Sequence, residues 1–193
     1  FPVWTPDAGF LILGSMPHLA WVRADGSGGI QRLTNASALQ SLGSFSPDGK
    51  TLAYAEFDQR HGFDLWTLPV QRTSQGLSAG TPSPFLQSPA FETHPCFSPD
   101  GKWISYASNE SGTWEVYVRA FPDNGTRLKV SAGGGRISRW SRTKPELLFR
   151  TDSQRLMLAT YVVSAGKMEI KSIREFPAPR LVDTGVLANF DLA

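Results

Sequence analysis

The chain has very little cysteine, and Cys96 is its single example. One cysteine excludes a disulfide within the chain, and the flanking Pro95 and Phe97 indicate a buried, inert side chain rather than a nucleophile. Long apolar runs are absent as well. The densest, residues 10–13, is far shorter than the about 18 residues that a membrane-spanning helix needs.

An excess of one charge is also lacking, because 19 Lys and Arg residues stand against 17 Asp and Glu residues. A formal net charge of +2 does not supply the positive track that a phosphate backbone requires, so nucleic-acid binding is not expected. The densest basic group is Arg136, Arg139, Arg142 and Lys144, which surround Trp140. We interpret Trp140 as a core residue and the arginines as a solvated rim, with contact to an acidic partner as the alternative.

Signatures of catalysis are scarce. A kinase Gly-rich loop, a His-Arg-Asp loop and an Asp-Phe-Gly motif are all missing. The glycine runs at 26–29 and 133–135 are not followed by Lys and Ser or Thr, so we interpret them as turns rather than phosphate loops. We also expect no nucleophile elbow of a serine hydrolase. The sequence therefore predicts no catalytic residue and no cofactor.

Gly and Pro are plentiful, with 18 and 14 residues, and they mark the turns of an internal repeat. Phe-Ser-Pro-Asp-Gly-Lys occurs at 45–50 and again at 97–102, each time before an apolar, β-prone stretch. Degraded copies begin at Trp4 and Trp140, and Leu192 would begin a fifth. The anchor residues Trp4, Phe45, Phe97 and Trp140 recur roughly every 40–50 residues, which is typical of four-stranded propeller blades.

Each copy of the repeat predicts short strands separated by turns. In the third copy they fall at 94–98, 102–108, 115–121 and 126–131. Other strands are predicted at 19–24, 30–34, 64–70, 156–164 and 168–173, and the Pro-rich segment 80–89 lengthens the second copy. Asp48 and Asp100 are expected to accept hydrogen bonds from turn amides, because Asp-Gly pairs favour tight turns. The first turn is interpreted as having Ala8 inserted before Gly9.

A sheet that is apolar on both faces needs a neighbour on each side, and stacking sheets around an axis provides both. We therefore predict an all-β fold, a β-propeller of four-stranded antiparallel blades, about four in number and part of a larger propeller. The blades are expected at about 1–41, 42–93, 94–137 and 138–191, with a further blade starting at 192–193. An incomplete ring would expose apolar faces and strand edges, so it would self-associate.

The two complete copies, 45–50 and 97–102 with the strands after them, resemble the WD-like repeats of TolB-like propellers. Residues 19–26 and 32–34 fit the same repeat, whereas 141–145 depart from it. The segments 106–112, 115–122, 130–135 and 139–141 are similar to the C-terminal propeller of bacterial membrane-bound serine/threonine protein kinases. The resemblance implies a non-catalytic module, usually outside the cytoplasm, that contacts a protein or small ligand. The lack of a long apolar run predicts no direct membrane insertion.

Binding is expected where the links between blades meet the loops between second and third strands. The candidate binding residues on this face are Asp58, Arg60, His61, Glu110, Arg136 and Arg139. His18, His61 and His94 could share the face, and three imidazoles suit zinc, or manganese with added carboxylates. Their spacing is not a local ligand motif, so we predict surface or hydrogen-bonded histidines and no metal.

Two enzyme-related alternatives stay open. The chain could be the gating propeller of a prolyl-oligopeptidase-type serine peptidase, whose catalytic triad lies in a separate domain. It could instead resemble sugar lyases that hold a metal in the mouth of a propeller. Stoichiometric metal would favour the lyase, and the complete reading frame would distinguish a kinase from a peptidase.

Overall fold

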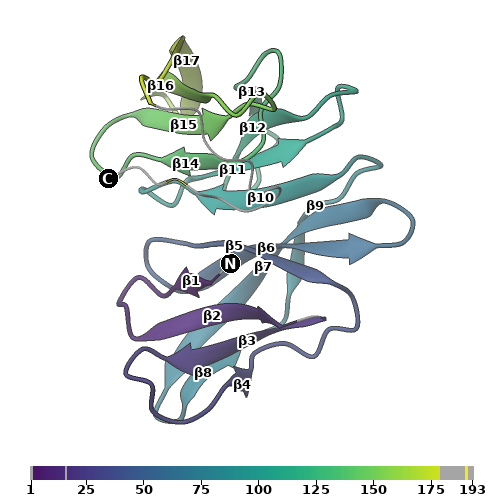
Figure 1. Ribbon diagram of the computed structural model, residues 1–193, viewed down its shortest axis with the longest axis vertical. Helices are drawn as coiled ribbons and strands as arrows, with labels where there is room; N and C mark the ends of the chain where they lie inside the picture. Colours follow the sequence, from purple (N-terminus) through teal and green to yellow (C-terminus); the bar gives the residue numbers. More distant parts are fainter. Residues whose placement is uncertain (1, 16, 179–189, 191–193) are drawn as a thin grey trace.

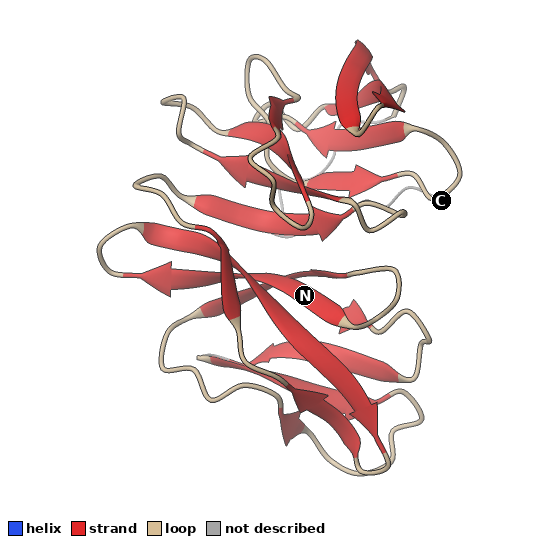
Figure 2. Cartoon of the chain, turned by 180° about the vertical axis from the view of Figure 1, so that it is seen from behind, coloured by secondary structure: helices blue, strands red, loops and turns tan. Residues whose placement is uncertain are grey.

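The computed structural model describes residues 2–15, 17–178 and 190. All regular structure in these residues is β-strand, arranged in four antiparallel sheets that follow one another along the chain. Figure 1 shows the sheets stacked in sequence order, with the first and the fourth at opposite ends, and Figure 2 shows the same strands from behind. The predicted all-β propeller architecture with four-stranded antiparallel blades is confirmed.

The first, third and fourth blades are meanders in which every strand pairs with the next. The first blade contains β1–β4, at Val3–Trp4, Phe10–Ser15, His18–Arg23 and Gln31–Arg32. The third contains β10–β13, at Glu92–Phe97, Trp103–Ser108, Glu115–Ala120 and Arg127–Lys129. The fourth contains β14–β17, at Ser138–Trp140, Glu146–Arg150, Leu156–Ser164 and Lys167–Glu175. The strands predicted in these blades are present, but β4 and β13 are shorter than the predicted 30–34 and 126–131.

The second blade has five strands because its outer edge is divided. Its strands β5–β9 lie at Gln40–Phe45, Thr51–Asp58, Gly62–Thr73, Gly76–Ala79 and Ser83–Leu86. β9 pairs with the first half of β7 and serves as the fourth strand, while the second half of β7 pairs with β8. We call this hairpin, residues 70–79, the arm. The strand predicted at 64–70 is therefore only part of β7, and the repeat does not predict the arm.

The arm packs on the first blade (Figure 1). A Cβ atom on Gly76 would lie 2.1 Å from Cη2 of Trp21, so this approach requires glycine, here at φ 136°. Arg72 forms an ion pair with Asp7, and its Cζ lies 5.1 Å from the centroid of the Phe10 ring. The arm thus joins the first two blades beyond their ordinary interface.

Apolar layers between consecutive blades form the core. The layer between the first two blades includes Phe10, Ile12, Leu19, Trp21, Leu42, Phe45, Leu52 and Leu68. The layer between the third and fourth includes Cys96, Trp103, Val116, Val118, Trp140, Leu147 and Phe149. Cys96 is buried, as predicted. A Cβ on Gly43 would lie 2.3 Å from the Pro95 carbonyl oxygen, so the first strands of the second and third blades approach with backbone in contact.

The anchor residues hold equivalent positions in their blades, because each pairs across to an apolar residue of the second strand. The pairs are Trp4 with Leu11, Phe45 with Leu52, Phe97 with Ile104, and Trp140 with Leu147. The last three anchors are 5–8% exposed, whereas Trp4 is 55% exposed. Each buried anchor lies against the preceding blade, and the difference at Trp4 follows from its place in the first blade. Leu192 lies outside the described residues.

The Pro-Asp-Gly turns have the predicted structural role. Asp48 Oδ1 accepts hydrogen bonds from Ser46 Oγ at 2.6 Å and from the Lys50 amide at 3.1 Å. Asp100 accepts the same two bonds in the third blade. The glycine that follows has φ of 71° in one turn and 69° in the other. The aspartates and glycines therefore close the turns.

The first turn has the same length as the other two. Its Phe10 amide donates to Thr5 Oγ1 at 3.1 Å, five residues back, as the Thr51 amide donates to Ser46 Oγ at 3.0 Å. Ala8, with φ 54°, therefore occupies the position of the turn glycine. The interpretation of Ala8 as an insertion is wrong, because equal spacing leaves no extra residue.

Candidate binding face

Because strands alternate in direction, the links between blades and the loops joining second to third strands lie at one end of the sheets. We call this end the loop face and the opposite end, with the Pro-Asp-Gly turns, the turn face. The candidate binding residues were predicted on the loop face.

Polar side chains tie the first and second blades together at the loop face. Thr34 Oγ1 donates to Gln40 Oε1 at 2.7 Å, and Gln40 Nε2 donates to Glu56 Oε2 at 2.6 Å. Thr34 and Gln40 are buried, whereas Glu56 is half-buried. The link, the first strand and the second strand are thus joined through side chains.

The second and third blades are tied at the corresponding place. Glu92 pairs across to Ser108 as Gln40 pairs to Glu56, and its Oε1 accepts hydrogen bonds from Ser88 Oγ at 2.6 Å and Ser108 Oγ at 3.4 Å. Burial raises the pKa of Glu92 to about 7, and the hydrogen bonds only partly oppose this effect.

Two further carboxylates act on Glu92. Asp64, on β7, and Glu110, in the β11–β12 loop, both raise the pKa of Glu92 through charge repulsion. Asp64 Oδ2 and Glu92 Oε2 are buried without a hydrogen-bond partner among the described residues, although His61 Nδ1 is 3.9 Å from Asp64 Oδ2. The junction is therefore acidic and incompletely paired.

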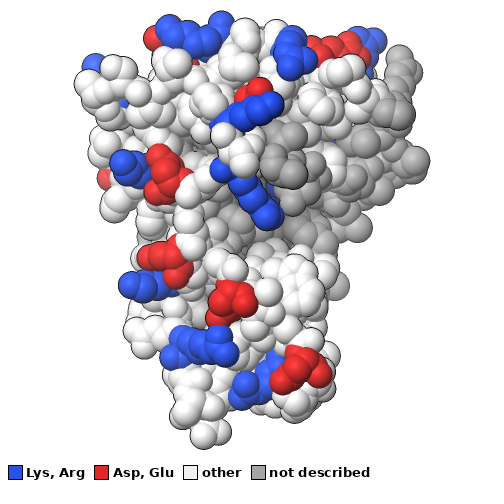
Figure 3. Space-filling view, turned by 90° about the vertical axis from the view of Figure 1, so that its left-hand side faces the viewer, with Lys and Arg blue, Asp and Glu red and all other residues white. Residues whose placement is uncertain are grey.

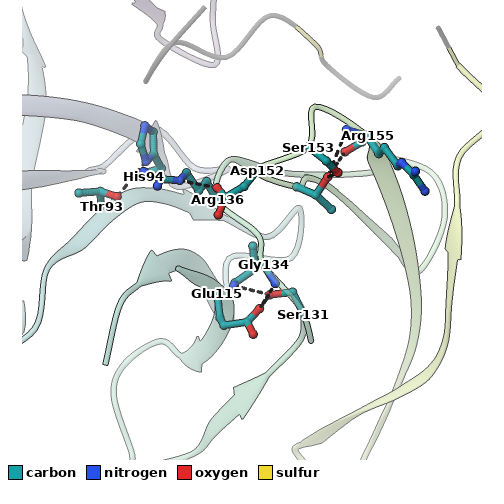
Figure 4. Close-up of polar contacts among 11 residues, drawn as sticks. Thr93, His94, Glu115, Ser131, Gly134, Arg136, Asp152, Ser153 and Arg155 are labelled. Atoms are coloured by element: carbon teal, nitrogen blue, oxygen red, sulfur yellow. Dashed lines mark hydrogen bonds and ion pairs between the residues drawn. The ribbon is translucent and has the colours of Figure 1, made fainter. Parts of the chain in front are cut away.

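At the third junction the buried carboxylate is fully supported (Figure 4). Glu115 Oε2 accepts hydrogen bonds from Ser131 Oγ at 2.5 Å and the Gly134 amide at 3.2 Å, and Lys129 Nζ lies 3.0 Å from Oε1. Burial alone would raise the pKa of Glu115, but these contacts together hold it below its usual value. These contacts indicate that the Glu115 carboxylate has a structural role.

The predicted residues of the β6–β7 loop lie together. Arg60 Nε is 3.2 Å from Asp58 Oδ1, and hydrogen bonds from the Arg60 side chain and amide lower the pKa of Asp58 to about 2. His61 follows directly and approaches Asp64. The charged side chains of this loop therefore interact with one another or with the start of β7.

The other predicted residues lie on later blades. Glu110 Oε2 accepts from Arg127 Nη1 at 2.7 Å. Arg136 donates to Asp152 at 2.7 Å, as Figure 4 shows, and its Cζ lies 4.7 Å from the Trp114 ring centroid. Half-buried Arg139 donates to a backbone carbonyl at 2.8 Å. The six candidates therefore form separate groups rather than one cluster.

The histidines belong to three different blades. His18 begins β3, His61 lies in the β6–β7 loop, and His94 on β10 contacts Thr93 Oγ1 through Nδ1 at 2.9 Å. No group of three or more His, Cys, Asp or Glu side chains that could hold a metal ion occurs within residues 2–15, 17–178 and 190.

One sequence pattern contradicts an expectation. Gly76-Leu77-Ser78-Ala79-Gly80 matches Gly-x-Ser-x-Gly, the pattern of a hydrolase nucleophile elbow, which we expected to be absent. An elbow requires a strand, a sharp turn and a helix, but exposed Ser78 lies on β8, within the arm. The pattern therefore has no catalytic context here.

A pocket of about 600 Å³ opens beside the hydrogen bonds that join Thr34, Gln40 and Glu56. Its wall comes from the link between the first two blades, from β6 and β7, and from the segment after the arm. The lining includes Thr34, Ser37, Gln40, Tyr54, Glu56, Trp66, Leu68 and Pro82. Sequence reasoning did not identify Glu56 or Trp66, because neither belongs to a motif.

Charged side chains elsewhere are mostly arranged in pairs. On the side shown in Figure 3, most Lys and Arg side chains lie beside Asp or Glu, and the residues drawn in colour form no broad patch of one sign. Residues 2–15, 17–178 and 190 contain no helix that could cross a membrane.

Comparisons with known proteins agree on the fold. The chain is similar to TolB from Acinetobacter baumannii, with 18% identity and a TM-score of 0.55 over 88% of this chain and 42% of that one. It is similar to the Cps50 (Swd1) β-propeller domain from Myceliophteria thermophila, with 15% identity and a TM-score of 0.56 over 78% and 47%. It also resembles a puromycin-hydrolyzing peptidase from Mycobacterium tuberculosis, with 14% identity and a TM-score of 0.60 over 92% and 31%.

No family model and no curated protein matches the chain. The chain spans less than half the length of these three structures. At such low identities the similarity establishes architecture alone. The chain is a β-propeller module with a TolB-like fold.

Proposed function

We propose that the chain is a non-catalytic interaction module that binds a protein or small ligand on its loop face. The observation that carries the proposal is the pocket on this face, between blades whose buried polar groups are tied to one another. Charged residues of neighbouring blades, such as exposed Arg60 and the ion-paired Glu110, lie in the loops beside the links. Recognition there needs no acid–base chemistry.

We further propose that the module works outside the cytoplasm as the sensor of a receptor-type serine/threonine kinase. The support is the sequence resemblance of segments 106–112, 115–122 and 130–135 to kinase-attached propellers. In this arrangement the kinase domain would be encoded in the same reading frame, and a frame without one would contradict the assignment.

Selection from a phage-displayed library of random decapeptides tests the loop face. The selected peptides are then titrated against two triple variants. Arg60→Ala, Glu110→Ala and Arg136→Ala together should weaken binding at least tenfold, because these side chains lie on the loop face. Their ion pairs are exposed or only half-buried, so the loss to stability is small.

The control is Lys50→Ala, Lys102→Ala and Lys144→Ala, which changes exposed residues of the turn face. This variant should bind the selected peptides as the parent does. Equal binding by the parent and the loop-face variant would overturn the proposal.

A second candidate is the gating propeller of a serine peptidase. The similarity to the puromycin-hydrolyzing peptidase over 92% of this chain favours it. The gating role predicts a triad-bearing hydrolase domain in the same reading frame, and sequencing of the complete gene tests it.

A further inference from the structure

The pocket between the first two blades carries negative charge and no positive charge on its described walls. Glu56 and Tyr54 are its only ionisable lining residues among those described. Burial and the neighbouring Glu56 carboxylate raise the pKa of Tyr54, so the hydroxyl stays neutral and Glu56 supplies the charge. Two other pockets border the arm, and both contain cationic side chains. One is lined by the Arg72–Asp7 pair, and the other by Arg23 and Arg32.

The Glu56 carboxylate is held in place without being neutralised. Its Oε2 accepts from Gln40 Nε2, and Gln40 is fixed in turn by Thr34. The donors in both hydrogen bonds are uncharged. No Lys or Arg within residues 2–15, 17–178 and 190 forms an ion pair with Glu56. A preorganised, uncompensated carboxylate at a pocket wall favours a cationic ligand, because little ordering entropy remains to be lost.

At the corresponding position between the second and third blades, Phe85 and Leu86 pack against an apolar cluster that contains Tyr106, the counterpart of Tyr54. The first blade cannot fill this space, because its fourth strand, β4, has only two residues. The pocket therefore results from a short outer strand, which leaves Glu56 and its surroundings accessible.

The remaining walls suit an organic cation. Trp66 is half-buried and pairs across to Tyr54, so its ring borders the pocket. An aromatic face stabilises an ammonium or guanidinium group through its quadrupole. The Tyr54 hydroxyl is buried and has no hydrogen-bond partner among the described residues.

We propose that this pocket binds the side chain of a lysine or arginine presented by a peptide segment of the partner. The ammonium or guanidinium group contacts the Glu56 carboxylate, and the aliphatic stem lies along Trp66. The assignment rests on the loop-face binding proposed above and names its chemistry. The volume lies within the range of small-ligand sites, roughly 300–1,000 Å³.

The test is an NMR titration of the ¹⁵N-labelled chain with Nα-acetyl-lysine methylamide and Nα-acetyl-arginine methylamide. The probes should shift the indole N–H signal of Trp66, which Trp66→Phe identifies among the six tryptophans. The neutral analogue Nα-acetyl-norleucine methylamide should bind at least tenfold more weakly. Equal binding of norleucine, or a shift confined to other indoles, would overturn the proposal.

Glu56→Gln should weaken binding of both cationic probes at least tenfold, because it removes the charge and keeps a group that can hydrogen-bond to Gln40. The matched control is Glu146→Gln, a half-buried carboxylate of the fourth blade, which should bind like the parent. Unchanged affinity in folded Glu56→Gln would contradict the cation site. Tighter binding of the lysine derivative than of 1,5-diaminopentane supports a peptide source, and the reverse order overturns that part.

The two proposals fail separately. If the selected decapeptides bind the loop face but are unaffected by Glu56→Gln, the interaction module stands and the cation pocket falls. If the loop-face variant binds the peptides as the parent does, the proposed module itself fails.

Discussion

Ala8 adopts a left-handed backbone conformation, φ 54°, where the second and third blades have glycine. A side chain makes this conformation unfavourable by about 1–2 kcal/mol, partly offset by the greater freedom of glycine in the unfolded chain. Ala8→Gly should therefore raise the free energy of unfolding by up to about 1 kcal/mol, measured by urea denaturation. Ala132→Gly, an exposed loop residue without positive φ, is the control and should not stabilise the chain. A destabilised Ala8→Gly would refute the prediction.

Glu92 makes stability depend on pH near neutrality. Its pKa is raised from 4.5 to about 7 on folding, so the native state binds the proton more tightly. This stabilisation is complete below pH 4.5 and is lost as pH rises through about 7. Urea denaturation from pH 5 to 7.5 should show a falling free energy of unfolding, and Glu92→Gln should flatten the decline.

Glu115→Gln is the control for this titration. The pKa of Glu115 is lowered, so its contribution is present above its unfolded pKa and lost only in acid. This variant should keep the decline between pH 5 and 7.5. A parent and a Glu92→Gln variant with parallel pH profiles would contradict the role of Glu92.

Residues with local roles could be predicted, and those with non-local roles could not. Asp48 and Asp100 bond within two residues of themselves, so the motif alone indicated their function. Glu56 and Trp66 line a pocket only because β4 is short and β6 pairs with β7 in a particular register. No sequence spacing encodes that combination.

At the scale of elements, the arm is fastened by the close approach of Gly76 to Trp21. Gly76→Ala would place Cβ 2.1 Å from the indole, and the overpacking should cost about 1–3 kcal/mol in addition to backbone strain. Gly28→Ala is the control, because it also has positive φ but no atom within 4 Å. Urea denaturation should show the larger loss for Gly76→Ala; equal losses would mean that the arm does not hold Trp21.

Strands were predictable because each repeats with its own turn, whereas the arm was not. Residues 71–79 have no counterpart in the other blades, so the repeat contains no signal for them. Their alternation places Leu77 and Ala79 against the first interface, but such a short pattern does not reveal which blade it covers. Only the tertiary contacts of the folded chain determine which blade the arm covers.

At the scale of the whole molecule, the free face of the first blade predicts self-association. Trp4 is 55% exposed and shares its face with half-buried Leu11 and Val22, whereas the equivalent anchors are covered by blades of the same kind. A second copy offers a matching surface. Sedimentation velocity should show concentration-dependent association that Trp4→Glu weakens at least tenfold.

Ile30→Glu is the control, because Ile30 is 65% exposed but lies in the β3–β4 loop. It should associate like the parent. A parent that stays monomeric at all concentrations would count against the prediction.

The architecture could be predicted from the repeat because propeller blades are built from residues close in sequence. The blade limits at 1–41, 42–93, 94–137 and 138–191 remain predictions, and 192–193 lie outside the described residues. Two blades depart from the repeat, the first through its short β4 and the second through its long β7, and both departures depend on contacts between blades. These departures create the arm and the pocket, so the site could not be derived from the repeat.

β7 is one continuous strand that pairs with β6, β9 and β8 and whose far end rests on the first blade. The first blade therefore cannot separate from the second unless the arm is released as well. Backbone amides of β2, β3 and β7 should then exchange their hydrogens through one shared opening, with similar protection factors. The first two blades would then behave as one cooperative unit.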